Sequence, residues 1–252
     1  MSAQGSRRRS SGRSTPVRPP ASSSPDRETG PRATPATGYG GTVTARRPEP
    51  RPIDGRTIRL EPLESAHYPE LFTAIAHPEV FAGGYGGGPA GLPTTQAEFD
   101  AFADGYFTTG VRNTYVIRLF GGEHDGLLVG TSTLGDFDEP GEAAHLGWTA
   151  YDPRVWGTAV NAETKLLLLG LAFDAGFGRV KIQADERNER SRTAILRLGA
   201  TFEGLIRRDK QRADGTWRTT ALFSVLAEEW PEVRAGLEER LARSPGPVAL
   251  RG

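Results

Sequence analysis

Cysteine is absent from this chain of 252 residues, which excludes thiol nucleophiles, disulfides and cysteine-based zinc sites. The histidines show no HxH or HxxxH spacing, so no metal is expected. They are His67, His77, His124 and His145. No apolar run approaches the roughly 20 residues of a membrane span, and no apolar stretch follows the N-terminal arginines as in a secretory signal. We therefore expect a cytoplasmic protein without membrane contact.

Lysine is also scarce, and charge is unevenly spread. Residues 1–52 hold ten arginines against three carboxylates, while the rest of the chain carries seven more acids than bases. This first segment consists mainly of Ser, Arg, Pro, Gly and Thr, and it cannot bury enough apolar area to offset its ordering entropy. We predict a disordered tail over 1–52. Its Arg7-Arg8-Arg9 run either touches RNA, the ribosome or an acidic partner, or belongs to a solvated tail or an incorrectly assigned start; nucleic acid contact is not expected.

The pattern changes at residue 53, and residues 53–243 read as one folded domain followed by a second disordered tail, 244–252. The stretch 82–93 carries six glycines and two prolines, which predicts a loop. Thr95 and Glu98 form a capping box that predicts a helix to about 106. The other helices are predicted at 67–76, 158–175, 189–198 and 228–241. The strands are predicted at 57–63, 114–119, 127–133, 143–150, 180–184, 202–210 and 216–226.

The most informative stretch joins the strand at 143–150 to the helix at 158–175. Gly157 lies in the turn where that helix opens, and a helix start exposes backbone N–H groups that lack an internal partner. These groups and the helix dipole favour an anion such as a pyrophosphate, to which Arg154 adds a charge-assisted contact. The pattern alone fits either a phosphate site or a plain strand-to-helix connection.

The residues that follow carry a family resemblance. The run Arg154-Val155-Trp156-Gly157-Thr158-Ala159 fits R-x-x-G-x-A, and Asp185 to Ser191 fits D-x-x-N-x-x-S. Together with Ile195 to Ala200, where Ala200 replaces a usual Phe, they resemble the GNAT acyltransferase superfamily and its RimJ/RimL branch over about 55–242. The resemblance implies a mixed α/β fold: a central, mostly antiparallel twisted sheet flanked by helices, whose fourth and fifth strands are parallel and splay apart at a bulge.

The same resemblance implies a co-substrate, acetyl-CoA, and direct transfer of the acetyl group to a primary amine through a ternary complex. It places the coenzyme pyrophosphate on the R-x-x-G-x-A loop and the pantetheine arm along the fourth strand. Asn188 either bonds a pantetheine amide or caps the next helix. The implied coenzyme residues are Trp148, Thr149, Tyr151, Arg154, Val155, Trp156, Gly157, Thr158, Ala159, Asn161, Asn188 and Ser191.

The catalytic residues depart from the family pattern. Ile195 stands where many members have a tyrosine that protonates the thiolate, so Ser191 is the candidate acid; otherwise it is a helix serine that bonds its own backbone. His145 stands where relatives have a glutamate. It is either a general base, as its usual pKa near 6.5 allows, or a packing residue in a site whose proton leaves through water. Glu142 is the second candidate base.

The acceptor is expected to be a protein N-terminal α-amine or a small-molecule amine. Deprotonating an α-amine at pH 7 costs about 1 kcal/mol, against about 4.6 kcal/mol for a lysine, so a site without a strong base favours amines of low pKa. The alternative is an acyl-CoA-binding sensor or scaffold without catalysis. A homodimer is compatible with the resemblance.

Overall fold

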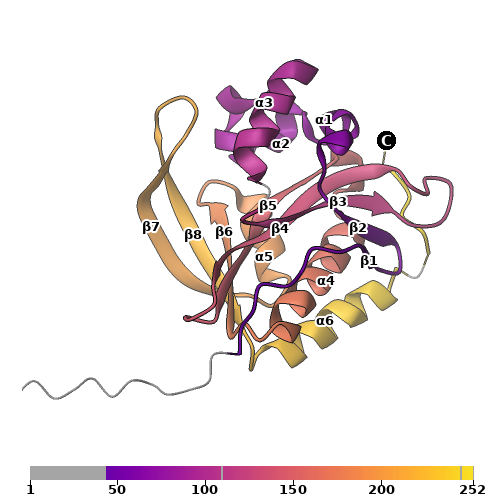
Figure 1. Ribbon diagram of the computed structural model, residues 1–252, viewed down its shortest axis with the longest axis vertical. Helices are drawn as coiled ribbons and strands as arrows, with labels where there is room; N and C mark the ends of the chain where they lie inside the picture. Colours follow the sequence, from indigo (N-terminus) through magenta and orange to yellow (C-terminus); the bar gives the residue numbers. More distant parts are fainter. Residues whose placement is uncertain (1–43, 109, 245, 252) are drawn as a thin grey trace, which may run out of the picture. The chain divides into compact units, whose positions relative to one another are not determined.

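The structure is a computed structural model that describes residues 44–251 except 109 and 245. Within these residues eight strands form one sheet in the order β1-β2-β3-β4-β5-β6-β8-β7 (Figure 1). All neighbouring strands are antiparallel except β5 and β6, which are parallel. The strands are Ile53–Asp54 (β1), Ile58–Pro62 (β2), Asn113–Leu119 (β3), Leu128–Asp138 (β4), Ala143–Tyr151 (β5), Arg179–Asp185 (β6), Thr201–Gln211 (β7) and Trp217–Leu226 (β8). The fold class implied by the resemblance is confirmed.

Helices cover both faces of this sheet. Helices α1 (Tyr68–Ile75), α2 (Pro78–Ala82) and α3 (Gln96–Phe107) pack on one face, and α4 (Val160–Asp174) and α6 (Trp230–Ala242) pack on the other (Figure 1). Helix α5 (Glu189–Leu196) lies beside β6. The expected capping box at the start of α3 is present. Helix α2 was not predicted, and the expected loop 82–93 contains the short 3₁₀ turns Tyr85–Gly87 and Pro89–Gly91.

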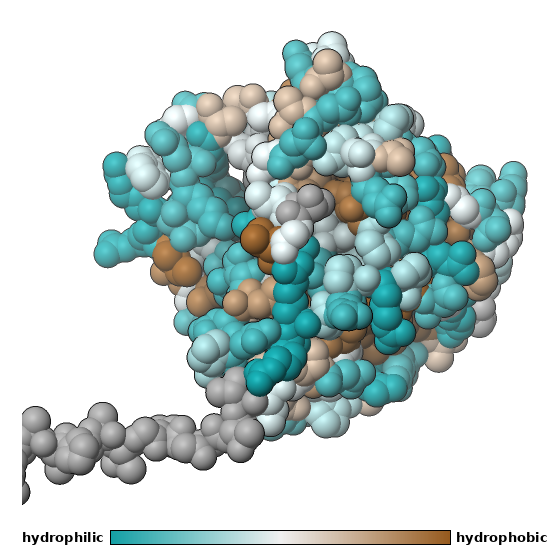
Figure 2. Space-filling view, in the orientation of Figure 1, coloured by the Kyte–Doolittle hydropathy of each residue, from teal (hydrophilic) through white to brown (hydrophobic). Residues whose placement is uncertain are grey.

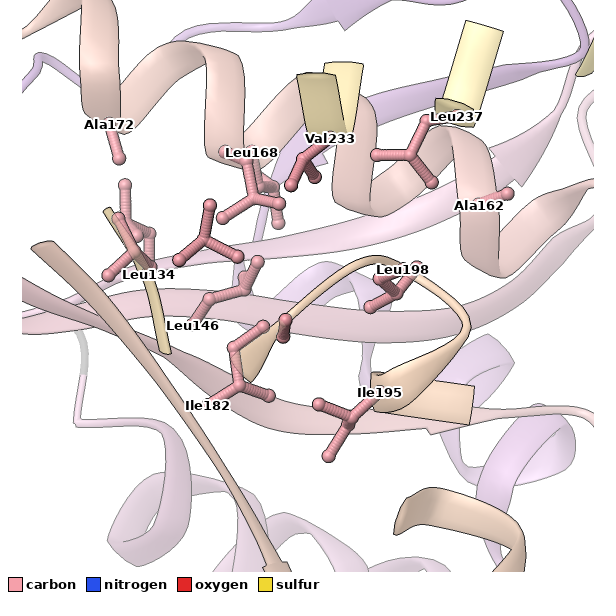
Figure 3. Close-up of a cluster of buried hydrophobic side chains, with 14 of the residues drawn as sticks. Leu134, Leu146, Ala162, Leu168, Ala172, Ile182, Ile195, Leu198, Val233 and Leu237 are labelled. Carbon is pink, nitrogen blue, oxygen red and sulfur yellow. The ribbon is translucent and has the colours of Figure 1, made fainter. Parts of the chain in front are cut away.

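The larger hydrophobic core fixes α4 against the sheet. Figure 3 shows Leu168 and Ala172 of α4 directed toward Leu134 of β4 and Leu146 of β5. These four side chains are almost completely buried, and burying a leucine contributes about 1.5–3 kcal/mol. Because α4 is held in this way, the loop at its N-terminus has a fixed position relative to β5.

The sheet opens between β5 and β6. The parallel pairing involves only the first three residues of β5, which end at His145, opposite residues 179–181 of β6. Beyond this point the ladder to β4 is also irregular: Gly147 pairs with Thr133 and Ala150 with Thr131, which leaves an extra residue on β5. Trp148 lies in this bulge with φ of 48°, a left-handed conformation that is unfavourable for a side chain of this size. The splay and the bulge match the expectation from the resemblance.

Two segments that composition placed in the tails pack on the body. In segment 44–52, Ala45 is fully buried and the Arg46 N–H donates to the Ala175 carbonyl at 2.9 Å. In segment 246–251, Val248 and Leu250 are partly buried against the larger core. Both predicted boundaries were therefore wrong, because a few well-placed apolar side chains suffice to order a short segment whose average composition is polar. The predicted disorder of residues 1–43 lies outside the described residues.

The surface is mainly hydrophilic in the view of Figure 2, with hydrophobic patches near the β7–β8 hairpin. This hairpin exposes four large apolar side chains: Phe202, Leu205, Ile206 and Trp217. The homodimer stays a prediction. No helix within the described ranges has the length and hydropathy to span a membrane.

Candidate functional site

A cavity lies where β5 and β6 separate. Its wall contains residues 146–151 of β5, Ile182 and Gln183 of β6, and residues of α4 and α5. Most residues that the sequence assigned to the coenzyme line it, namely Trp148, Thr149, Tyr151, Val155, Trp156, Gly157, Asn161, Asn188 and Ser191. Arg154, Thr158 and Ala159 belong to the adjoining loop but do not line the cavity. The fold thus brings β5, β6, α4, α5 and the loop before α4 together, with Val80 and Tyr85 completing the wall.

The loop before α4 has the geometry of an anion site. Asp152 accepts a hydrogen bond from the Arg154 N–H at 2.9 Å and pairs with the Arg154 guanidinium at 2.7 Å, which shapes a 3₁₀ turn. Gly157 has φ of 73°, a conformation that favours glycine. The N–H groups of Gly157, Ala159 and Asn161 make no hydrogen bond to any described residue. These donors and the positive end of α4 together favour a negatively charged group.

Lys165 is a buried amine that lines the cavity. Only 4% of it is exposed. Its Nζ donates to Thr149 Oγ1 at 2.7 Å and to Ser132 Oγ at 3.2 Å. Burial lowers the pKa of Lys165 from 10.5 to about 7, because removing an ammonium group from water disfavours its charged form. No described carboxylate lies within ion-pair distance to offset this effect.

His145 and Asp136 form a hydrogen-bonded pair on the opposite face of the sheet from α4. His145 Nδ1 lies 3.0 Å from Asp136 Oδ2, and Lys181 Nζ lies 3.5 Å from the same carboxylate oxygen. The hydrogen bond with His145 holds the pKa of Asp136 down to about 2. Sequence reasoning missed Asp136. The register of the β4–β5 hairpin pairs Gly135 with His145 and so brings Asp136 beside that histidine. Predicting this register from the sequence would have identified Asp136.

The second nitrogen of His145 is unpaired. His145 Nε2 is buried and has no hydrogen-bond partner among the described residues, and the ring lies 4.6 Å from the Trp148 ring, centroid to centroid. A Cβ atom built on Gly147, a cavity residue, would lie 2.8 Å from Nε2, so this nitrogen is next to the bulge. Burial is the main influence on the His145 pKa and lowers it, while the Asp136 hydrogen bond opposes that shift. A neutral ring with Nδ1–H facing Asp136 leaves the Nε2 lone pair free.

The first turn of α5 forms the other wall of the cavity. Asn188 is the N-cap of α5, because its Oδ1 accepts from the Ser191 N–H at 2.9 Å, and its Nδ2 donates to the Gly83 carbonyl at 2.7 Å. The helix-capping interpretation is therefore correct, and Asn188 also ties α5 to the glycine-rich loop. The Ser191 hydroxyl makes no hydrogen bond to another described residue. Ile195 also lines the cavity.

Tyr85 in the glycine-rich loop is a cavity residue that sequence reasoning missed. Its side chain lines the cavity from the side of α2, and its hydroxyl is buried without a described hydrogen-bond partner. Burial raises the pKa of Tyr85 well above 10, so it remains a hydrogen-bond donor throughout the physiological pH range. The signal was weak, because a tyrosine between glycines is as typical of a loop as of a site.

Glu142 is not part of this site. It lies at the start of β5, five residues before Gly147, a separation of about 16 Å along an extended strand. Its carboxylate accepts hydrogen bonds from the N–H and hydroxyl groups of Thr44 at 3.2 and 3.3 Å. Glu142 therefore anchors segment 44–52, and we withdraw it as a candidate base.

Comparisons with known proteins agree with this geometry. The acetyltransferase (GNAT) domain family matches residues 57–201. A solved protein from T. thermophilus, provisionally described as an acetyltransferase, is 35% identical, with a TM-score of 0.69 over 78% of this chain and 100% of its own. A GCN5-related N-acetyltransferase from Brucella melitensis is 27% identical, with a TM-score of 0.70 over 80% and 90% of the two chains.

More distant structures share the fold alone. RimJ from Mycobacterium smegmatis, solved in complex with CoA-disulfide, is 19% identical, with a TM-score of 0.60 over 76% of this chain and 91% of its own. No curated protein matches the chain. The domain match extends over more than half of the sequence and coincides with the splayed strands, the loop and the cavity. The chain therefore belongs to the GNAT family of acetyltransferases, which are acyltransferase enzymes.

Proposed function

We propose that this protein transfers an acetyl group from acetyl-CoA to the nitrogen of a primary amine, with both substrates bound at once. The observation that carries the proposal is the meeting of the open β5–β6 gap and the anion-binding loop in one cavity. Holding two reactants in place in this way removes up to roughly 7–11 kcal/mol of a barrier. Acetyl-CoA supplies the activated acetyl group and a thiolate leaving group.

The residues around the cavity fit acetyl-CoA. The N–H groups of Gly157, Ala159 and Asn161, which no described residue pairs with, suit a pyrophosphate. Beyond His145, β5 has no strand partner on its β6 side, so its backbone is available to an extended arm that carries amide groups. At the bulge, N–H groups of this backbone are placed to stabilise negative charge that develops on the thioester oxygen.

His145 is our proposed base. His145 does not line the cavity itself, and its buried Nε2 lies behind the cavity residue Gly147. With Nδ1–H donating to Asp136, the Nε2 lone pair takes up the amine proton, directly or through a water molecule. Because burial keeps the His145 pKa below its usual value, the ring is neutral at pH 7 and available for this role. Asp136 fixes the tautomer and stabilises the ring when it gains the proton. Asp136 is thus a positioning residue.

Ser191 is our proposed acid for the departing thiolate. Ser191 lines the cavity, and its hydroxyl has no described hydrogen-bond partner that would compete for the proton. Its backbone is held by Asn188, the cap of α5, so the hydroxyl projects from a fixed helix start. The tyrosine found at position 195 in many relatives is replaced here by a cavity-lining isoleucine.

For the acceptor we propose an amine of low pKa, either a protein N-terminal α-amine or a small-molecule amine. A neutral histidine with a pKa below 6.5 is a weak base, and at pH 7 the lysine amine costs about 3.6 kcal/mol more to deprotonate than an α-amine. The glycine-rich loop borders the same cavity through Tyr85. We place the acceptor between this loop and the His145 face of the sheet.

The test is calorimetric binding of acetyl-CoA, followed by thiol release against a panel of amines that includes peptides with free α-amines and Nα-blocked lysine. Gly157→Trp serves as the matched variant, because a side chain there is strained and meets Arg251. We expect micromolar binding, its loss in the variant, and faster release with α-amines. Binding without release from any amine would favour the sensor interpretation, and an equal rate with lysine would refute the acceptor class.

A further inference from the structure

Segment 246–251 lies against the loop that opens α4. The Arg251 N–H donates to the Arg154 carbonyl at 2.9 Å, and the Arg251 guanidinium donates to the Gly157 carbonyl at 3.3 Å. Val248 and Leu250 pack against the core cluster that also contains Val155. The backbone of the segment is therefore anchored, and its arginine is held directly over the loop.

The Arg251 guanidinium is short of partners. A guanidinium has five N–H donors, yet among the described residues the Arg251 side chain donates only one hydrogen bond, the long one to Gly157. No carboxylate among the described residues forms an ion pair with it. A Cβ atom built on Gly157 would lie 3.1 Å from both terminal nitrogens of Arg251, so the charged group occupies the space in front of this glycine.

Neighbouring groups show what this space is suited to bind. The N–H groups of Gly157, Ala159 and Asn161 have no hydrogen-bond partner in the described part of the chain. From the α5 side, the Arg190 guanidinium lies 3.3 Å over the Trp156 ring and has no described acid within ion-pair distance. Arg154, in contrast, is neutralised by Asp152 at 2.7 Å. Unpaired N–H groups and two unneutralised guanidinium groups suit an anion with several charged oxygens.

We infer that Arg251 is a phosphate-binding residue of the coenzyme site, supplied by a segment outside the family-matched residues 57–201. This inference rests on the proposed function, because it takes CoA as the ligand. When CoA binds, the guanidinium turns from the Gly157 carbonyl to a phosphate and donates two hydrogen bonds to it. Because packing of Val248 and Leu250 places the arginine beforehand, little chain entropy is lost in forming the contact.

The experiment compares CoA binding to the full-length wild type, Arg251→Ala and Arg251→Lys by calorimetry. Arg234→Ala is the matched control, because Arg234 is an exposed arginine of α6 that pairs with Glu238. We expect Arg251→Ala to weaken CoA binding about tenfold or more, Arg251→Lys to recover part of this, and the control to match wild type. The melting temperature of the ligand-free protein should be unchanged in Arg251→Ala. The CoA affinity of this variant should fall less steeply with salt concentration than that of the wild type.

Three results would overturn the inference while leaving the proposed function intact. CoA affinity equal to that of wild type in Arg251→Ala would make the contact incidental. Tighter binding in this variant would show that the segment blocks the loop. A lower melting temperature with a proportionate loss of affinity would make the role of Arg251 structural. Failure of the wild type to bind CoA would overturn both proposals.

Discussion

Replacing Lys165 with methionine should change how stability depends on pH. In the folded protein burial lowers the Lys165 pKa to about 7, whereas the unfolded value is 10.5. The unfolded chain therefore binds more protons than the folded one between these values, and stability must rise with pH across the window. The contribution of Lys165 to stability is highest above pH 10.5 and is lost as the pH falls toward 7. Below pH 7 the full penalty applies, roughly 5 kcal/mol at about 1.36 kcal/mol per pKa unit.

The measurement is the free energy of unfolding in urea at pH 7.5 and 9.5 for wild type and Lys165→Met. Subtracting the variant removes the titration of all other groups. The difference should shift by about 2–3 kcal/mol in favour of the wild type as the pH rises. Methionine fills a similar volume, so the hydrogen bonds lost to Thr149 and Ser132 give a constant offset. If the difference in unfolding free energy changes by less than about 0.5 kcal/mol between the two pH values, the size of ordinary surface effects, the lowered pKa of Lys165 is refuted.

Three further predictions concern the site and its support. His145→Gln should lower kcat by about 10²–10⁴-fold. In wild type, kcat/KM should fall as the pH drops through the His145 pKa, which lies below 6.5. Asp136→Asn should move this fall in kcat/KM to lower pH, and an unchanged pH profile would exclude the pair from proton transfer. Ser191→Ala should lower kcat while leaving the calorimetric affinity for CoA unchanged, and equal kcat would exclude it as the acid. Glu163→Gln should destabilise the fold by about 2–3 kcal/mol in urea unfolding, because the buried Glu163 carboxylate accepts from the Thr57 N–H at 3.1 Å and from its hydroxyl; a loss under about 0.5 kcal/mol would contradict this.

Local signals in the sequence were enough to predict most elements of the fold. The α4 prediction, 158–175, differs from Val160–Asp174 only at its ends, because a leucine-rich stretch closed by glycines is read correctly from near neighbours. Helix α2 was missed because it has only five residues and adjoins a glycine-rich run, so any longer stretch used to predict a helix there contains several glycines. The packing of segments 44–52 and 246–251 depends on surfaces made by distant residues, which composition does not reveal.

The candidate site divides in the same way. Gly157 and Asn188 lie in short motifs whose local geometry follows from the sequence, so their places were predicted. The His145–Asp136 pair needs the register of a hairpin, and Tyr85 reaches the cavity only through the course of an irregular loop. Arg251 is far along the chain from the loop that it contacts, and no sequence pattern predicts that they meet. Contacts made by chain-distant segments therefore required the structure.

The gap between β5 and β6 creates two strand edges in the interior of a sheet. Exposed edges usually invite another strand, and these edges face each other with pairing at only one end. Such a slot selects for an extended molecule that offers amide donors and acceptors at peptide-like spacing, as pantetheine does. Binding would then complete the ladder. Those amide hydrogens of residues 146–151 that point away from β4 should therefore exchange rapidly in the free protein and slowly once CoA is bound. The least completely paired part of the sheet is therefore the part whose hydrogen bonding the ligand completes.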